Sequence, residues 1–253
     1  CFEINYAHYN TYFRELDTRI GKWWTIDPRS KNFAWESPYI SMGNNPLLRN
    51  DIKGDEWQST ADSKKANQMS KSYSKREKYY KKQSEKYQNK LIKAIDKDND
   101  KKISKYGKLT DHFTAGMREM QTAQAELLAI GNSERCFRFN ELEEGAASGS
   151  TTTDQDGTTV FNYIDDANLS HELKHGYLSM IGEQEGIPGT GVFRYVDLMD
   201  EVECYTRQFY FASSSMPLSD AGSITKASDI TRYYVNGIYS LDQFGGKVYL
   251  YKS

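Results

Sequence analysis

The sequence contains few cysteines and no long apolar run. Its three cysteines, Cys1, Cys136 and Cys204, are odd in number and widely spaced, so they indicate neither a disulfide framework nor a CxxC metal pair. No apolar stretch approaches the roughly 20 residues of a membrane-spanning helix, and we expect no stable membrane insertion. The mean hydropathy of -0.79 is low for a single compact domain and indicates that part of the chain does not contribute to a core.

A starting methionine and a secretory signal are also lacking, because the chain opens Cys1-Phe2-Glu3. We therefore expect a piece of a longer polypeptide whose targeting information lies elsewhere. The chain has 253 residues, of which 38% are hydrophobic. That is enough for one fair-sized core, or for one domain with appendages.

The small net charge of -2 conceals a strongly basic segment. The segment from Lys64 to Lys108 contains 16 basic and five acidic residues, so its net charge is +11 and that of the remainder is -13. A basic run can bind nucleic acid or an anionic membrane. This one lacks glycine-rich loops and nucleic-acid motifs, and the C-terminal half, where a nuclease site would have to lie, is acidic. We interpret the segment as a solvated helix and expect no nucleic-acid partner.

Composition divides the chain into residues 1–55, 56–130 and 131–253. The first segment is rich in aromatic and turn residues, and short alternating runs such as Gly21–Ile26 predict brief strands. The second is predicted to be a helical linker, with a helix capped by Asp55 and another from about Asp111 to Ala129. Gly131-Asn132 would end the second helix.

The run Asp96–Asp100 between these helices resembles the first half of an EF-hand calcium loop. Lys101 stands where that loop needs glycine, and Gly107 stands where it needs a bidentate glutamate. We therefore expect an acidic turn between helices.

Residues 131–253 carry the densest fold signals. Residues 136–140 and 158–164 alternate like strands, and the stretch from Gly145 to Gly157 between them is small and polar. Helices are predicted at about 166–182, with Asp165 or Asp166 as the cap, and at about 196–211. The expected fold class is α+β, with a small antiparallel sheet and two helices.

The pentad His171-Glu172-Leu173-Lys174-His175 fits His-Glu-x-x-His. Residues four apart lie on one face of a helix, so both imidazoles can reach one metal ion. Glu172, one residue further round, could then accept a proton from a water that the metal activates. The pattern predicts a zinc site with Glu172 as general base.

A catalytic zinc site needs a third protein ligand and one open position. No histidine follows His175, so a carboxylate must supply the ligand. Glu201 lies beside a predicted apolar stripe made of Leu198, Val202, Tyr205 and Phe209. Glu203 points further away, where it could pair with Arg207 four residues on. We predict Glu201 as the ligand and keep Glu203 as the alternative.

These helices resemble the glutamate-ligand branch of the zincin metallopeptidases, in which the third ligand stands in a Glu-x-x-small motif on a second helix. Here the motif is Glu201-Val202-Glu203-Cys204, 26 residues after His175. The resemblance implies a zincin-like domain that hydrolyses a protein or peptide, which could pair with the edge of a strand near Thr158–Ile164. The residue that stabilises the transition state stays open among the following candidates: Tyr205, Tyr233, Tyr234 and His112.

The first segment is similar to the Rhs repeat-associated core. The similarity rests on several blocks in order: Tyr9–Asp17, Arg19–Pro28, Ser37-Pro38-Tyr39 and Gly43-Asn44-Asn45-Pro46. Where that family has an Asp-Pro-x-Gly box, this chain has Asp51-Ile52-Lys53-Gly54, without the proline. The resemblance implies a β shell that encloses a C-terminal toxin. It also implies a cognate immunity protein as a partner, and secretion of the toxin or its delivery into a target cell.

Together these patterns predict a zinc-dependent endopeptidase that forms the toxin tip of an Rhs-type polypeptide. The alternative is a non-enzymatic binding or membrane-acting toxin module that uses the basic helical segment.

Overall fold

The structure is a computed structural model, and it divides the chain into two units, Cys1–Thr60 and Ala61–Ser253. It describes residues 4–5, 8–10, 15–26, 37–39, 41, 60–133, 135–143, 146, 148–155, 157–187, 192–194, 197–241 and 245–251. The protein is α+β, as the sequence predicts. No helix in these ranges is long and apolar enough to cross a bilayer.

The first unit contains a short antiparallel meander of four strands in the order β1 (Ile4–Asn5), β2 (His8–Asn10), β3 (Glu15–Asp17) and β4 (Lys22–Trp23). Leu16 and Trp23 face each other across β3 and β4, and both are buried. Gly21 adopts a φ of 63° in the turn between these strands, a conformation that favours glycine. The predicted cap Asp55 and the run Asp51–Gly54 lie outside the described residues.

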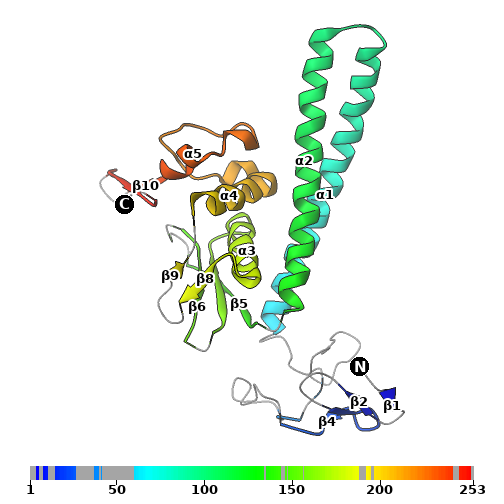
Figure 1. Ribbon diagram of the computed structural model, residues 1–253, viewed down its shortest axis with the longest axis vertical. Helices are drawn as coiled ribbons and strands as arrows, with labels where there is room; N and C mark the ends of the chain where they lie inside the picture. Colours follow the sequence, from blue (N-terminus) through cyan, green and yellow to red (C-terminus); the bar gives the residue numbers. More distant parts are fainter. Residues whose placement is uncertain are drawn as a thin grey trace. The chain divides into compact units, whose positions relative to one another are not determined.

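Two long helices, α1 (Thr60–Ile95) and α2 (Asp100–Gly131), form an antiparallel hairpin (Figure 1). The acidic run forms the turn between them, and Asn99 caps α2 by accepting a hydrogen bond from the backbone N–H of Lys102. Helix α2 therefore starts 11 residues before the predicted Asp111, because the Asn99 cap lets the basic residues that follow it join the helix. Gly116 allows close packing, since a Cβ there would lie 2.6 Å from the Tyr80 ring.

The second unit also contains a three-stranded sheet in the order β5 (Phe137–Glu141), β7 (Thr159–Tyr163), β6 (Ser150–Thr153). The prediction of a purely antiparallel sheet is wrong: β7 pairs with β6 antiparallel but with β5 parallel. The polar run that forms β6 lies inside the stretch interpreted as a loop. Because β6 pairs with one side of β7 and β5 pairs with the other, β7 is the central strand.

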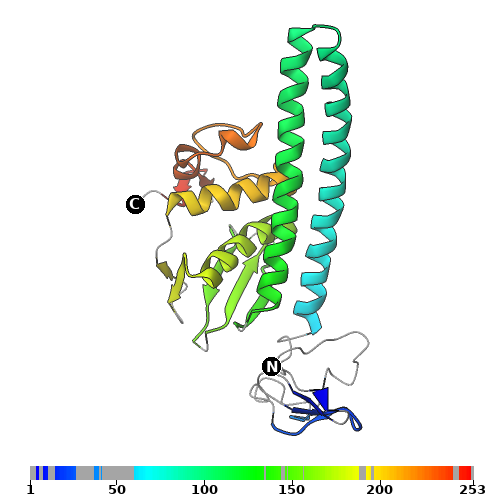
Figure 2. The ribbon, with the colours of Figure 1, turned by 45° about the vertical axis from the view of Figure 1, so that its right-hand side comes forward.

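Helix α3 (Asp166–Ile181) packs on this sheet, and α4 (Leu198–Ala212) packs on α3 (Figure 2). Asp165 caps α3, Asp197 caps α4, and Gly182 ends α3 with a φ of 86°. Gly176 brings α3 onto the sheet, because a Cβ at that position would lie 2.3 Å from the ring of Phe161 on β7.

The remaining elements lie beside the sheet and α4. They are β8 (Glu185–Ile187), β9 (Val192–Arg194), η3 (Ser213–Ser215), η4 (Ala227–Asp229), α5 (Arg232–Asn236), β10 (Tyr239–Leu241) and β11 (Lys247–Tyr249). Strands β8 and β9 form one hairpin, and β10 and β11 form another. Strands β8 and β9 contact β6, and α5 and the 3-10 turns η3 and η4 contact α4.

The helical hairpin, which composition predicted as a helical linker or helical subdomain over residues 56–130, packs into the same unit as the C-terminal fold. The Tyr73 hydroxyl of α1 donates to Ser170 on α3 at 3.1 Å, and the Tyr80 hydroxyl donates to the carbonyl of Tyr210 on α4 at 2.8 Å. One apolar core therefore extends from the hairpin through α3 and α4 to the sheet.

A buried charge network also links α2 to these helices. Arg207 on α4, only 1% exposed, donates to Glu119 at 2.9 Å and forms an ion pair with Glu126. Lys174 on α3 bonds the same Glu126 at 3.1 Å and also pairs with Glu203. The predicted pair between Arg207 and Glu203 is therefore wrong, because Arg207 faces the hairpin and Glu203 faces α3.

Candidate metal centre

Helix α3 presents His171 and His175 on one face, toward α4, as four-residue spacing dictates. Their Nε2 atoms lie 3.2 Å apart. The Glu201 carboxylate on α4 reaches both rings: one oxygen lies 3.4 Å from Nε2 of His171, and the other lies 3.4 Å from Nε2 of His175. All three residues are less than 9% exposed. Two neighbouring helices thus bring two imidazoles and one carboxylate together inside the protein.

The spacing of these donor atoms fits a tetrahedral zinc ion. With zinc bonds of about 2.05 Å to nitrogen and oxygen, the donors of a tetrahedral site lie about 3.3 Å apart. The 3.2 Å between the two Nε2 atoms matches that edge length, and the Glu201 carboxylate presents a different oxygen to each ring, each at 3.4 Å. Imidazole nitrogen and carboxylate oxygen are also ligands that zinc prefers. The residues present therefore fit zinc in both chemistry and spacing.

The Glu172 carboxylate is held by two hydrogen bonds. The Thr151 hydroxyl, on edge strand β6, donates to one oxygen at 2.9 Å, and the Asn168 amide, one turn back on α3, donates to the other at 3.3 Å. Glu172 itself is only 4% exposed. These contacts place an oriented carboxylate between the metal-binding face of α3 and the sheet edge.

The Nδ1 atoms of the two histidines have different hydrogen-bond surroundings. Nδ1 of His175 lies 3.3 Å from the Gln184 side-chain oxygen, so its N–H can donate there and leave Nε2 free for a metal. Nδ1 of His171 is buried without a hydrogen-bond partner among the described residues. Gln184 is a supporting residue that the sequence does not reveal, since it follows the helix in a segment without periodicity.

Two tyrosines complete the surroundings of Glu201. The Tyr251 hydroxyl donates to Glu201 at 2.9 Å and lies 3.0 Å from the Tyr205 hydroxyl. The Tyr205 ring packs edge-on against His171, with centroids 4.3 Å apart. Sequence reasoning proposed Tyr205 but missed Tyr251, which no motif marks.

Burial and charge shift the pKa values of this cluster. Burial would raise the pKa of Glu201, but hydrogen bonds with His171 and His175 hold that pKa well below its ordinary value. Burial would lower the pKa of His175, yet its interactions with Cys204 and Glu201 outweigh burial and raise that pKa well above 6.5. Burial raises the pKa of both tyrosines, which therefore stay neutral hydrogen-bond donors at physiological pH.

The other candidates from the sequence lie away from the donor cluster. The side chain of Glu203 is 56% exposed and pairs with Lys174. Tyr233 is 72% exposed, and the Tyr234 hydroxyl donates to the carbonyl of Pro217. His112 packs among the aromatic rings between α2 and α4.

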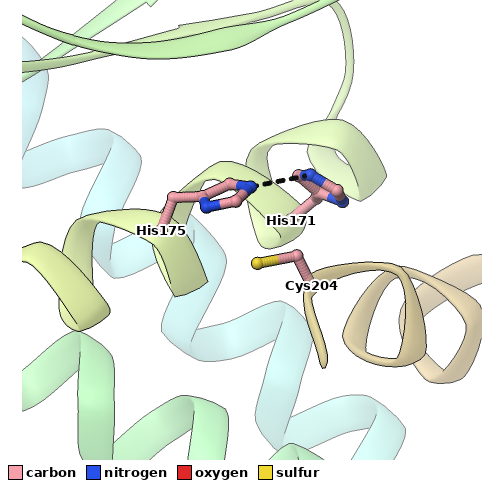
Figure 3. Close-up of side chains that lie close together, drawn as sticks. All are labelled: His171, His175 and Cys204. Carbon is pink, nitrogen blue, oxygen red and sulfur yellow. Dashed lines mark hydrogen bonds between the residues drawn. The ribbon is translucent and has the colours of Figure 1, made fainter. Parts of the chain in front are cut away.

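A fourth helix-borne donor, besides Glu201, lies near the two histidines. Figure 3 shows Cys204 extending from α4 toward the rings of His171 and His175. The donor atoms of these three residues all lie within 4.8 Å of one another. The sequence marked Cys204 only as a small residue at a helix contact.

No protein-family model matches the chain, and neither the curated proteins nor the solved structures contain a match.

Proposed function

We propose that residues 61–253 form a zincin-like, zinc-dependent endopeptidase. The observation that carries this proposal is the buried grouping of His171, His175 and Glu201: the two Nε2 atoms lie 3.2 Å apart, close to a tetrahedral zinc edge, and a Glu201 oxygen lies 3.4 Å from each ring. Three protein ligands would leave one position open for water or substrate, as a catalytic site requires.

Each residue of the cluster has a role in this proposal. When bound, zinc supplies a Lewis acid that lowers the pKa of water and polarises a carbonyl group. Glu172, oriented by Thr151 and Asn168, accepts the proton of the attacking water and passes it to the leaving amine. The Tyr251 hydroxyl holds Glu201 in place, and the neutral Tyr205 hydroxyl, which contacts that of Tyr251, could turn to donate to developing negative charge.

The sheet edge next to Glu172 is β6. Strand β7, which the sequence suggested as a substrate edge, is the central strand, so its backbone groups are already paired on both sides. Within the described ranges, β6 forms its ladder with β7 and contacts the β8–β9 hairpin, and its Thr151 contacts Glu172. An extended peptide that lay along β6 would pass beside the general base.

The wider biological setting is part of the same proposal. The Rhs-like blocks of the first segment support a polypeptide whose shell encloses this domain, with a cognate immunity protein and with release by secretion or delivery into a target cell. The short antiparallel meander of residues 4–23 is compatible with the β structure of such a shell.

Metal analysis combined with peptide cleavage tests the proposal. The purified chain should carry one zinc and cleave peptides in a proteome-derived library read by mass spectrometry. Glu172→Gln should keep the zinc and lose about 10²- to 10⁴-fold in rate, because an amide cannot act as a base. Glu183→Gln, which changes an exposed glutamate just after α3, is the matched control and should retain full activity.

Two outcomes would contradict the proposal. Absence of stoichiometric zinc, in protein refolded with zinc present, would remove the metal site. Full peptidase activity in Glu172→Gln would remove this mechanism. Toxicity to cells that persisted in Glu172→Gln would favour the alternative, a binding or membrane-acting module on the basic hairpin.

A further inference from the structure

Cys204 occupies a position that packing alone does not require. It is fully buried, at 0% exposure, and lies one turn after Glu201 on the face of α4 that meets α3. Its sulfur lies beside the imidazole rings of His171 and His175 (Figure 3). A buried cysteine that only filled space would place its sulfur among carbon atoms.

The position of the sulfur suits coordination. In a tetrahedral site with a zinc–sulfur bond of about 2.3 Å, the sulfur lies about 3.6 Å from each nitrogen ligand. The three donor atoms here already lie within 4.8 Å of one another, so a movement of about 1 Å would bring the sulfur to bonding distance. Because Glu201 and Cys204 are three residues apart on one helix, both can face the same ion.

We propose that Cys204 is a fourth protein ligand that closes the metal site in the resting protein. This inference rests on the proposed zinc site. The thiol releases its proton to solvent when the sulfur binds the metal, and the thiolate takes a proton back when it leaves. With Glu201 as the single anionic ligand, a zinc site with two neutral histidines would carry a net charge of about +1. A Cys204 thiolate would reduce that charge to about zero.

Closure has a functional consequence. Four protein ligands leave no position for water, which is the state of structural zinc sites rather than catalytic ones. The lower charge also weakens the polarisation on which hydrolysis depends. The closed form would therefore hold its metal tightly and be inactive, and the peptide cleavage of the purified chain would come from the fraction in which the sulfur has left.

Cobalt(II) spectroscopy of the full chain tests this arrangement, because a cobalt–thiolate bond gives an intense near-ultraviolet charge-transfer band. We expect the wild-type protein to show that band and to saturate at one equivalent of cobalt. Cys204→Ser, which preserves the side-chain shape, should lose the band and still bind cobalt. Cys136→Ser, at a cysteine outside the cluster, is the matched control and should keep the band. Circular dichroism checks the fold, and Cys204→Ala serves if the serine variant does not fold.

The outcomes separate the two proposals. Stoichiometric cobalt binding by the wild-type protein without a thiolate band would overturn the role of Cys204 and leave the metal site intact. Failure to bind zinc or cobalt at all would instead defeat the proposed function. If the closed form predominates by about ten to one, Cys204→Ser should cleave peptides about tenfold faster per bound metal. A rate equal to that of the wild type would overturn closure.

Discussion

The buried charge network between α2, α3 and α4 allows a quantitative test of the fold. Replacing Arg207 by methionine removes the guanidinium that bonds Glu119 and Glu126 and keeps a side chain of similar length. The arginine side chain is 1% exposed, and the carboxylates that it would leave behind are 25% and 7% exposed. The substitution therefore removes the positive charge that neutralises two carboxylates, in a place that water reaches poorly.

The size of the effect follows from what remains. Removal of one partner from a buried ion pair costs about 3–5 kcal/mol, because the other charge is left uncompensated. Here Lys174 still bonds Glu126 at 3.1 Å, and Glu119 is partly solvated, so the lower end of that range applies. For a domain of roughly 150–250 residues, about 3 kcal/mol lowers Tm by about 6–12 °C.

Thermal unfolding by circular dichroism, with a chelator present so that metal binding adds no stability, measures this loss. Arg138→Met is the matched control: its ion pair with Asp154 is 2.7 Å long, but the two side chains are 50% and 43% exposed. An exposed pair contributes about 0–1 kcal/mol, so the control should lose less than about 4 °C. An Arg207→Met protein that melted within about 2 °C of the wild type would refute the buried network.

Two further predictions concern the metal cluster. Glu201→Gln should weaken zinc binding more than roughly 100-fold, since loss of even an outer partner of a metal ligand lowers metal affinity about 10- to 100-fold. Glu203→Gln should leave the zinc affinity nearly unchanged. Competition with a chromophoric chelator measures both affinities, and a larger loss in Glu203→Gln would make Glu203 the ligand. In the metal-free protein, the pKa of His175 is raised above its ordinary 6.5, so its contribution to stability is complete below pH 6.5 and is lost as the pH rises through the folded-state value. Tm of the chelated protein should therefore fall on the alkaline side, and a Tm that rose over that range would contradict the assigned interactions.

Local patterns predicted α3 and α4 well. Helices α3 and α4 lie within two residues of their expected bounds, because periodicity and the Asp165 and Asp197 caps act over a few residues. The same locality places His171 and His175 on one face. The side of α4 that carries Glu201 also followed from its apolar stripe, of which Tyr205 and Phe209 are buried.

Contacts that depend on the path of the chain could not be predicted in this way. Strand β6 is the polar run Ser150–Thr153, and it becomes a strand only because β7 lies beside it. Tyr251 reaches Glu201 from 50 residues away, after the chain has passed through α5 and the β10–β11 hairpin. The sequence alone predicts that Arg207 is exposed, and the residue is buried because α2 packs against it. Each of these contacts is set by tertiary packing rather than by spacing in the sequence.

The packing of the hairpin against α3 and α4 determines where the unit Ala61–Ser253 can be cut without loss of its fold. A shortened protein that began after α2 would lose the partners of Arg207 and of Lys174 and would expose the apolar surface beneath Tyr73. A break within the lysine-rich helices would therefore yield an aggregating remnant rather than a smaller folded domain. The portable piece begins before Ala61, so any recombination that grafts this domain onto another polypeptide has to carry both long helices with it.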